Sequence, residues 1–343
     1  MRILLVGDQH FRNELPYGAA FKDGRRSEWN AVKAAIHEAS EGCDAVVLLG
    51  DNLNSRHNHS SVIREFVDFL NGFGTMDVYS IAGNHERYGT STALDFLKEV
   101  DRQNWRIFTE VETIESNGMK MTFMPYMTAG SLGVKNNEES VAKLIELAVG
   151  GDILFTHHAI AGAEWGASST EHMNEPVLPL EGIEAKYGRI FAGHIHKPQY
   201  LSPRTLVTGS IFTSEVGEGS KSVYVYDTKD DSVKDIKLPV RGIYKIVWEN
   251  FVSEPSHDTE SVPPNSIVKC YVTSRQTNLE DVKRCLKSFD ASIIIEQYPR
   301  ERTKVHFQEG GLNLSIDNML KVYSDVRKVD YGELKAGFDI IRK

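Results

Sequence analysis

The chain alternates short, continuous apolar runs with segments in which apolar residues recur every three or four positions. A continuous run bounded by glycine or polar residues is typical of a strand that is buried on both faces. Such runs span residues 2–7, 44–50, 78–82, 152–156 and 189–192. Trp29, Val32 and Ile36 have helical spacing after Ser27, a candidate N-cap, and residues 60–73 show the same spacing. This alternation predicts an α/β fold with a mainly parallel sheet and crossover helices.

Shorter alternating runs at residues 119–125 and 205–227 predict antiparallel additions at the sheet edges. The pattern changes near residue 241. The following segments predict a βαβ unit, with strands and one helix at residues 244–248, 266–273, 278–288 (the helix) and 292–297. We therefore expect a main domain, a small βαβ capping domain and a C-terminal helical segment, over residues 1–240, 241–308 and 309–343.

The C-terminal segment is predicted to present one apolar stripe. Ile316, Met319, Leu320 and Tyr323 have the spacing of an amphipathic helix that lies on another surface. The alternative is that the stripe covers the sheet of the main domain. The polar and basic stretch before it, residues 300–308, could follow DNA phosphates or simply be solvated.

Composition limits the class of protein. With 343 residues, 41% of them hydrophobic and 25% charged, the chain has the composition of a globular protein with room for two domains. No apolar run approaches the roughly 20 residues of a membrane-spanning helix, and the N-terminal run is too short for a signal peptide. Three cysteines without CxxC spacing fit a reducing compartment, so we expect a cytoplasmic protein.

The net charge of −9 argues against a protein that binds nucleic acid over its whole surface. Binding of nucleic acid would require a local basic patch, bound metal ions or the surface of a partner.

Residues of the kinds that bind metals follow five of the predicted strands, at the point where each strand ends. They are Asp8 and His10, Asp51, Asn84 and His85, His157 and His158, and His194 and His196. Because the carboxyl ends of strands in an open α/β sheet converge on one crevice, we expect these side chains to meet. Each has another explanation when taken alone, such as a helix N-cap for Asp51 or a packed core histidine for His157. His57 and His59 are expected to be solvated loop residues.

The residue types point to catalytic metal ions. Asp8, Asp51 and Asn84 offer oxygen and the histidines offer nitrogen, whereas no cysteine is near enough in sequence for a closed thiolate zinc site. Mixed nitrogen and oxygen ligands suit manganese, iron or zinc. The ligands are too many for one catalytic ion. They fit two ions, roughly 3.5–4 Å apart, that share a carboxylate and stabilise both oxygens of a displacement at phosphorus.

The motifs D-x-H, G-D-N, G-N-H-E, a strand-end His and G-H-I-H, over roughly residues 1–200, resemble those of the calcineurin-like metallophosphoesterases. A narrower resemblance is to the SbcD-type nuclease subunits of double-strand-break repair, including phage recombination endonuclease subunits. It rests on residues 124–126, 193–199, 208–210 and 214–215. The resemblance implies a four-layer sheet sandwich, a DNA-capping domain after residue 241, and C-terminal helices that dock on the coiled-coil base of an SbcC-type ATPase.

The resemblance also implies roles for the site residues. Asp8, His10 and His196 would hold one ion, and a second group would hold the other, with Asp51 as the bridge; the second group is Asn84, His157 and His194. His157 is preferred to His158 because it is the first residue past its strand. The two divalent ions are expected to be Mn²⁺, with Fe²⁺ or Zn²⁺ as alternatives.

His85 would lie beside the scissile phosphate as a general acid or transition-state stabiliser and would not bind metal. The chain departs from the family at Asn52-Leu53-Asn54, where an aromatic residue and an Asp are frequent, and at Glu86, where Asp is frequent. These departures leave the contacts to substrate open.

The resemblance thus implies a DNA exonuclease and endonuclease subunit, a homodimer that works with an SbcC-type ATPase in recombination and double-strand-break repair. The alternative is a free-standing metallophosphoesterase that acts on a small phosphodiester or a phosphoprotein. A degenerate, inactive scaffold is disfavoured because all seven ligand positions are filled.

Overall fold

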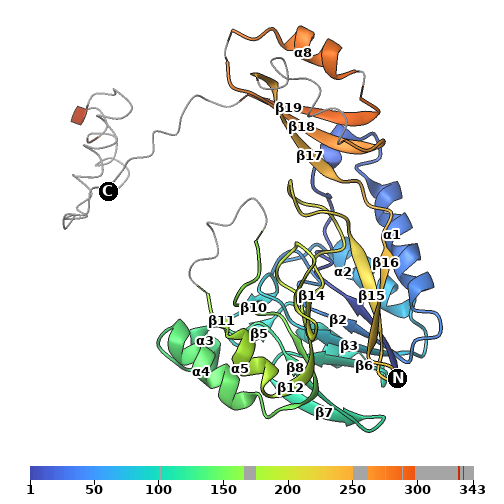
Figure 1. Ribbon diagram of the computed structural model, residues 1–343, viewed down its shortest axis with the longest axis vertical. Helices are drawn as coiled ribbons and strands as arrows, with labels where there is room; N and C mark the ends of the chain where they lie inside the picture. Colours follow the sequence, from blue (N-terminus) through green and yellow to red (C-terminus); the bar gives the residue numbers. More distant parts are fainter. Residues whose placement is uncertain are drawn as a thin grey trace.

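The structure is a computed structural model that describes residues 1–100, 102–165, 175–249, 262–274, 276–287, 289–297, 331–332 and 335. Two six-stranded sheets are stacked in its larger part (Figure 1). The first sheet consists, in spatial order, of β16 (Ser232–Lys237), β15 (Ser222–Asp227), β1 (Arg2–Val6), β2 (Ala45–Leu48), β3 (Asp77–Ile81) and β6 (Trp105–Phe108). The second consists of β13 (Gln199–Ser202), β14 (Thr205–Val207), β12 (Tyr187–Ala192), β9 (Gly151–Thr156), β8 (Met119–Met124) and β7 (Glu112–Ser116).

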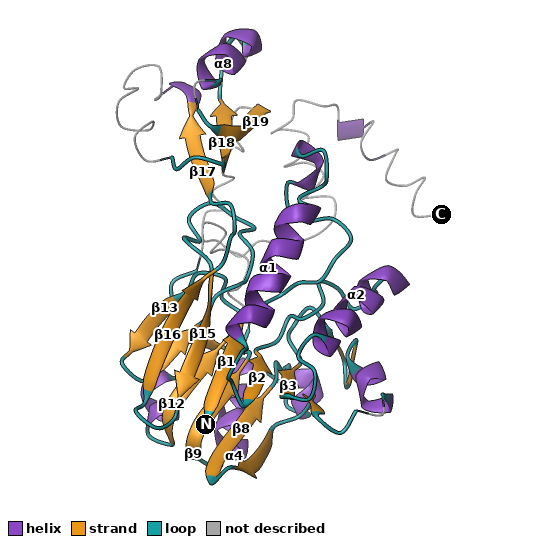
Figure 2. Ribbon diagram, turned by 90° about the vertical axis from the view of Figure 1, so that its right-hand side faces the viewer, coloured by secondary structure: helices purple, strands orange, loops and turns teal. Residues whose placement is uncertain are grey.

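Alternate residues of the central strands face different cores, which explains why these strands are continuously apolar in sequence. In β1, Ile3 and Leu5 pack between the two sheets, whereas Leu4 and Val6 pack under the helices. Helices cover both outer faces (Figure 2): α1 (Arg26–Ala39) and α2 (Ser60–Asn71) on the first sheet, and α3 (Ala129–Leu132), α4 (Asn137–Leu147) and α5 (Leu180–Glu184) on the second. The order of layers is helix, sheet, sheet, helix, so the predicted α/β four-layer sandwich is confirmed.

Short elements complete the larger part. They are η1 (Gly18–Ala20), η2 (Asp95–Glu99) and the paired short strands β4 (Arg87–Tyr88) with β5 (Ser91–Thr92) and β10 (Ala159–Ile160) with β11 (Val177–Leu178).

Two details of the sequence prediction are wrong. The runs at residues 119–125 and 205–207 are antiparallel to one neighbour only, because β8 is parallel to β9 and β14 is parallel to β12. A short alternating run does not determine the direction of its partner. Ser27 is not the N-cap of α1, because that helix begins at Arg26 and the carboxylate of Asp23 accepts from Arg25 N and Ser27 N, both at 3.0 Å.

A smaller unit follows the sandwich. Its parallel strands β17 (Ile243–Val247), β18 (Ser266–Val272) and β19 (Ala291–Gln297) carry helix α8 (Leu279–Leu286). Val282 and Leu286 of α8 pack on Val268 and Cys270 in a hydrophobic cluster of their own. These elements occur where the sequence predicts them. The basic stretch 300–308 and the apolar stripe of Ile316, Met319, Leu320 and Tyr323 lie outside the described residues.

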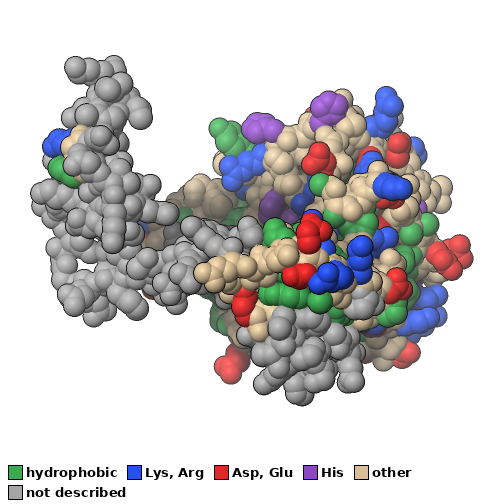
Figure 3. Space-filling view, turned by 90° about the horizontal axis from the view of Figure 1, so that it is seen from above, with side chains coloured by type: hydrophobic (Ala, Val, Ile, Leu, Met, Phe, Trp, Pro, Cys, Tyr) green, Lys and Arg blue, Asp and Glu red, His purple; other side chains and the backbone are tan. Residues whose placement is uncertain are grey.

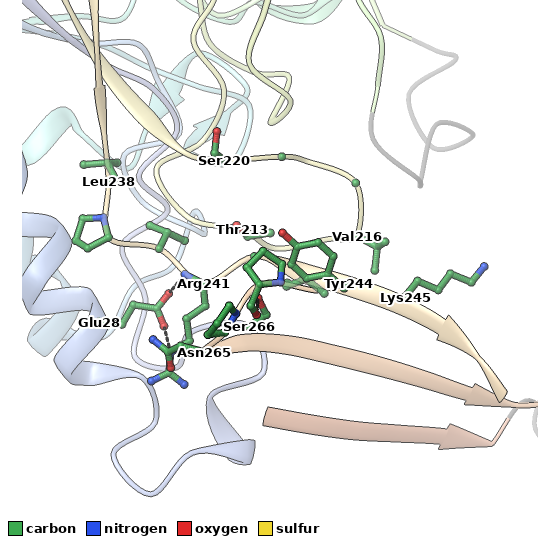
Figure 4. Close-up of a pocket in the computed structure, with 18 of the residues that line it drawn as sticks. Glu28, Thr213, Val216, Ser220, Leu238, Arg241, Tyr244, Lys245, Asn265 and Ser266 are labelled. Atoms are coloured by element: carbon green, nitrogen blue, oxygen red, sulfur yellow. Dashed lines mark hydrogen bonds and ion pairs between the residues drawn. The ribbon is translucent and has the colours of Figure 1, made fainter. Parts of the chain in front are cut away.

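The two units meet beside the connection between β1 and α1. Glu28 binds the buried side chain of Arg25 through two contacts of 2.6 and 2.8 Å and accepts from Arg241 N at 3.0 Å. Lys269 Nζ of the smaller unit donates to the hydroxyl of Tyr17 at 3.3 Å. A cleft of about 880 Å³ opens at this junction (Figure 4). The smaller unit therefore adjoins the end of the sandwich at which β1 leads into α1.

Among the described residues, no helix is long and apolar enough to cross a membrane. On the face shown in Figure 3, basic and acidic side chains are interspersed and do not form separate patches.

Candidate metal centre

Five strands from both sheets end at one place. β1, β2 and β3 are neighbours in the first sheet, and β9 and β12 are neighbours in the second. The connections after these strands carry the predicted metal-binding side chains: Asp8, His10, Asp51, Asn84, His157, His194 and His196. The pattern of strands predicts that they lie along the edge of one sheet, whereas the sandwich brings the edges of two sheets together and the side chains meet between them.

Asp8, His10 and His196 form one group, in which possible ligand atoms lie within 4.8 Å of one another. The Nε2 atoms of His10 and His196 are 3.0 Å apart. Both carboxylate oxygens of Asp8 accept from His194 N, at 2.9 and 3.1 Å, which holds the carboxylate in place. These are the residues that the sequence resemblance assigned to one ion.

Asn84, His157 and His194 form a second group. Oδ1 of Asn84 lies 3.1 Å from Nε2 of His157 and 3.0 Å from Nδ1 of His194. Asp51 lies between the two groups: its Oδ1 is 3.4 Å from His157 Nε2 and its Oδ2 is 3.7 Å from His10 Nε2. A carboxylate that bridges two ions needs this arrangement, with one oxygen directed at each group.

The backbone turns sharply at three of these residues. His10, Asp51 and His194 have φ angles of 48°, 47° and 76°, in the left-handed region that side chains other than glycine seldom adopt. Such conformations cost energy and persist at functional sites, where the surrounding structure enforces them. Space is also restricted: a Cβ atom on Gly83 would overlap Oδ1 of Asp51, and one on Gly50 would overlap the ring of His157. The motifs therefore need glycine at both positions.

The donor atoms fit divalent cations. Nδ1 of His157 donates to Leu49 O at 2.6 Å, so the free electron pair of the neutral ring is on Nε2, which faces the oxygens of Asn84 and Asp51. Buried electron pairs that face one another are unfavourable unless a cation or a proton lies between them. Nitrogen and oxygen donors without thiolate suit manganese, iron or zinc.

The buried carboxylates control the charge of the centre. Burial alone lowers the pKa of His157, but Asp51 and Asp8 outweigh burial and raise that pKa to about 9. Burial raises the pKa of Asp51, yet His157 and His10 hold it well below its usual value. In the metal-free protein at neutral pH, a proton on His157 therefore supplies positive charge where a metal would otherwise bind.

Metal affinity is expected to rise with pH, because a metal ion must displace this proton from His157. Since the pKa of His157 is about 9 in the metal-free protein, the apparent affinity should increase about tenfold per pH unit for each proton displaced, up to about pH 9. Titration of the metal-free protein with Mn²⁺ between about pH 6 and 9, in buffers of different ionisation heat, measures both affinity and proton release. An affinity that does not change with pH would contradict this description of the centre.

His85 lies at the rim of the centre. Its side chain is 42% exposed, and Nε2 is 3.8 Å from Oδ2 of Asp51. Nδ1 donates to Asn54 O at 2.9 Å, which orients the ring with Nε2 toward the cluster. The backbone N of His85 donates to Asp51 Oδ1 at 2.9 Å. With His10 and Asp51 it also forms a group whose possible ligand atoms lie within 4.8 Å of one another, so this position at the rim is compatible with contact to substrate or to metal.

The other histidines considered as candidates lie elsewhere. His158 is buried, and its Nε2 accepts from Met127 N at 3.2 Å, while its ring stacks on Tyr126. Of the pair after β9, the structure brings His157 to the cluster and keeps His158 outside it. His57 and His59 are exposed, as expected of loop residues, and His59 caps α2 by accepting from Ser61 N.

Three acidic residues near the centre were not predicted as functional. Glu86 is fully buried and accepts from Leu53 N and Gly83 N, both at 2.7 Å, and thereby ties together the connections that carry Asp51 and Asn84. The sequence feature that could have identified Glu86 is its position in the G-N-H-E motif. Glu175 and Glu218 contact His194 and His196 from distant parts of the sequence, and no local pattern distinguishes them.

Residues 1–198, more than half of the chain, match the calcineurin-like phosphoesterase family. None of the curated proteins matches the chain. Among the matching solved structures is a novel archaeal phosphodiesterase with 13% sequence identity and a TM-score of 0.35, and the match covers 69% of this chain and 100% of that one.

The family match covers all seven predicted metal-binding positions, and the folded chain gathers them at one point. This chain belongs to the calcineurin-like phosphoesterases and is a metal-dependent hydrolase of phosphate esters.

Proposed function

We propose that this phosphoesterase is the nuclease subunit of a DNA recombination and repair complex and hydrolyses phosphodiester bonds of DNA. The proposal rests on the position of the segments that resemble SbcD-type nuclease subunits more specifically than the general family motifs do. Residues 124–126 are far in sequence from residues 208–210 and 214–215, yet each of these segments contacts the turn that carries His194 and His196.

The contacts are specific. The ring of Tyr126 lies against that of His194, with centroids 5.6 Å apart. Ser210 N donates to His196 O at 3.2 Å, and the Oγ of Ser214 is 3.1 Å from His196 Nδ1. Gly209 has a φ of 72°, and a Cβ there would approach His196 O to 2.7 Å. The features that resemble the nuclease subunits therefore shape the metal centre itself.

The chemistry is that of hydrolysis at phosphorus. Two divalent ions, when bound, activate water and neutralise charge on the phosphate. Asp51 would hold both ions, and His85, in its doubly protonated form, would donate the Nε2 proton to the leaving oxygen while its Nδ1–H stays bonded to Asn54 O. We propose Mn²⁺ for these positions, because imidazole nitrogen and carboxylate oxygen together suit it better than Mg²⁺.

The charge of the chain favours a partner. The net charge is −9, and the basic side chains on the face in Figure 3 are interspersed with acidic ones. A polyanion such as DNA would then be attracted by the metal ions and by a second subunit. We propose that an SbcC-type coiled-coil ATPase supplies this surface, that the segment 309–343 docks on it, and that two copies of the chain form the complex.

The test compares substrates. The purified chain with Mn²⁺ is expected to degrade labelled duplex DNA, faster with an SbcC-type ATPase and ATP, and a chelator should abolish cleavage. The same protein should also hydrolyse bis(p-nitrophenyl) phosphate, which needs the metal centre alone. Hydrolysis of the small diester or of a phosphopeptide, without cleavage of DNA when the ATPase is present, would favour the free-standing phosphoesterase.

A further inference from the structure

Each histidine of the turn 193–196 directs its second ring nitrogen at an oxygen from a distant connection. Nε2 of His194 lies 2.9 Å from Oε2 of Glu175. Nδ1 of His196 lies 3.1 Å from Oγ of Ser214, which in turn is 2.7 Å from Oε1 of Glu218. Both histidines thus have a carboxylate behind them, on the side opposite the metal cluster.

Hydrogen-bond directions follow from the number of available protons. The single hydroxyl proton of Ser214 is donated to Glu218, so the Ser214 oxygen accepts from Nδ1–H of His196. This fixes the tautomer of His196 and leaves the electron pair on Nε2, the atom that lies 3.0 Å from Nε2 of His10.

Glu218 is held firmly. Its side chain is 2% exposed, its Oε2 lies 2.6 Å from Lys221 Nζ, and the same oxygen accepts from Ser214 N at 3.1 Å. Lys221 Nζ donates to His196 O and to Ser210 Oγ, both at 2.8 Å. The carboxylate is therefore fixed to the backbone of the histidine that it orients.

The contact to His194 fixes the opposite tautomer, in which the ring proton is on Nε2. Glu175 is 8% exposed and accepts from Nε2–H of His194, so the electron pair of that ring is on Nδ1. Nδ1 is the atom that faces Oδ1 of Asn84 at 3.0 Å. The two histidines of one short turn therefore present different nitrogens, each toward its own group of ligands.

We propose that Glu175 and Glu218 are positioning residues that control the two metal positions separately. Glu218, acting through Ser214, sets His196 for the ion shared with Asp8 and His10. Glu175 sets His194 for the other ion. Carboxylates behind metal-binding histidines commonly contribute about 10- to 100-fold in metal affinity. The proposal rests on the ligand groups described above and does not depend on which phosphate ester is the substrate.

The test measures Mn²⁺ affinity in two backgrounds, by calorimetric titration of the full chain. His10→Ala disrupts the metal position shared with Asp8 and His196 and keeps the one that includes Asn84. Asn84→Ala disrupts the position shared with His157 and His194 and keeps the one that includes His10. In the Asn84→Ala background, Glu218→Gln should weaken binding about 10- to 100-fold, and Glu175→Gln should change it less than about twofold. In the His10→Ala background the two effects should be exchanged.

Two further variants separate positioning from loss of structure. Ser214→Ala removes the hydroxyl that links Glu218 to His196 and keeps the Glu218–Lys221 pair. It should show the same selectivity as Glu218→Gln with a loss that is no larger, because Oε1 of Glu218 also lies 3.5 Å from His196 Nδ1. Glu184→Gln is the matched control, because Glu184 is also a largely buried carboxylate that binds hydroxyls, those of Ser202 and Thr205, away from the histidines. It should leave both affinities unchanged. Equal losses in both backgrounds, or no loss in either, would overturn the proposal, whether or not the protein cleaves DNA.

Discussion

Replacing Asp51 by Asn is expected to weaken both metal ions together and to lower phosphoesterase activity by about a thousandfold or more. The variant keeps the shape of the side chain and removes the charge that faces His157 on one side and His10 on the other, at 3.4 and 3.7 Å. Stabilisation of charge by a metal ion is worth several kcal/mol, and each 1.36 kcal/mol corresponds to about tenfold in rate. Elemental analysis after dialysis against Mn²⁺, with hydrolysis of bis(p-nitrophenyl) phosphate, measures both effects.

A matched control for this variant is Asp235→Asn, which removes a half-exposed carboxylate from an ion pair with Lys237 on β16. That change should leave metal content and rate as they are in the unaltered protein, because exposed ion pairs contribute little. Retention of both ions by Asp51→Asn would show that this carboxylate does not bridge them.

Replacing His85 by Ala is expected to lower the rate by about 10²- to 10⁴-fold, the usual contribution of general acid catalysis, while both ions remain bound. The reason is positional. His85 is 42% exposed at the rim, its ring is held by the hydrogen bond from Nδ1 to Asn54 O, and alanine keeps the backbone N that donates to Asp51 Oδ1. The rate with a poor leaving group should fall more than the rate with p-nitrophenolate, which needs no proton to depart.

His57→Ala is the control for His85→Ala, since His57 is an exposed histidine in the neighbouring connection. It should have the activity of the unaltered protein on the small diester. A His85→Ala protein that has lost a metal ion would instead identify His85 as a ligand, and the assignment as proton donor would then be wrong.

The sequence was sufficient to locate the metal centre because polar residues after buried strands are conspicuous. Asp8, Asp51 and Asn84 each follow an apolar run, and the rule that strand ends converge brings them together without knowledge of the whole fold. The pattern did not reveal that His157 and His194 belong to a second sheet. Periodicity describes a strand and not its neighbours, and only the resemblance to a known family supplied the sandwich.

Glu175 and Glu218 could not be recognised in the same way. Glu218 lies between Gly217 and Gly219 in a connection without regular structure, so no periodicity indicates that it is 2% exposed. The resemblance drew attention to Ser214 and its neighbour Glu215. The carboxylate that Ser214 binds is instead that of Glu218, three residues after Glu215. Long-range hydrogen bonds of this kind depend on the path of the connections, which local pattern does not encode.

Anomalous X-ray diffraction from crystals grown with Mn²⁺ decides whether this chain has a two-metal centre, because it counts the ions and locates them. A two-metal centre requires two manganese positions per chain, roughly 3.5–4 Å apart, both in contact with the carboxylate of Asp51. One should also contact Asp8, His10 and His196, and the other Asn84, His157 and His194. A single manganese position, or two positions that do not share Asp51, would contradict this assignment.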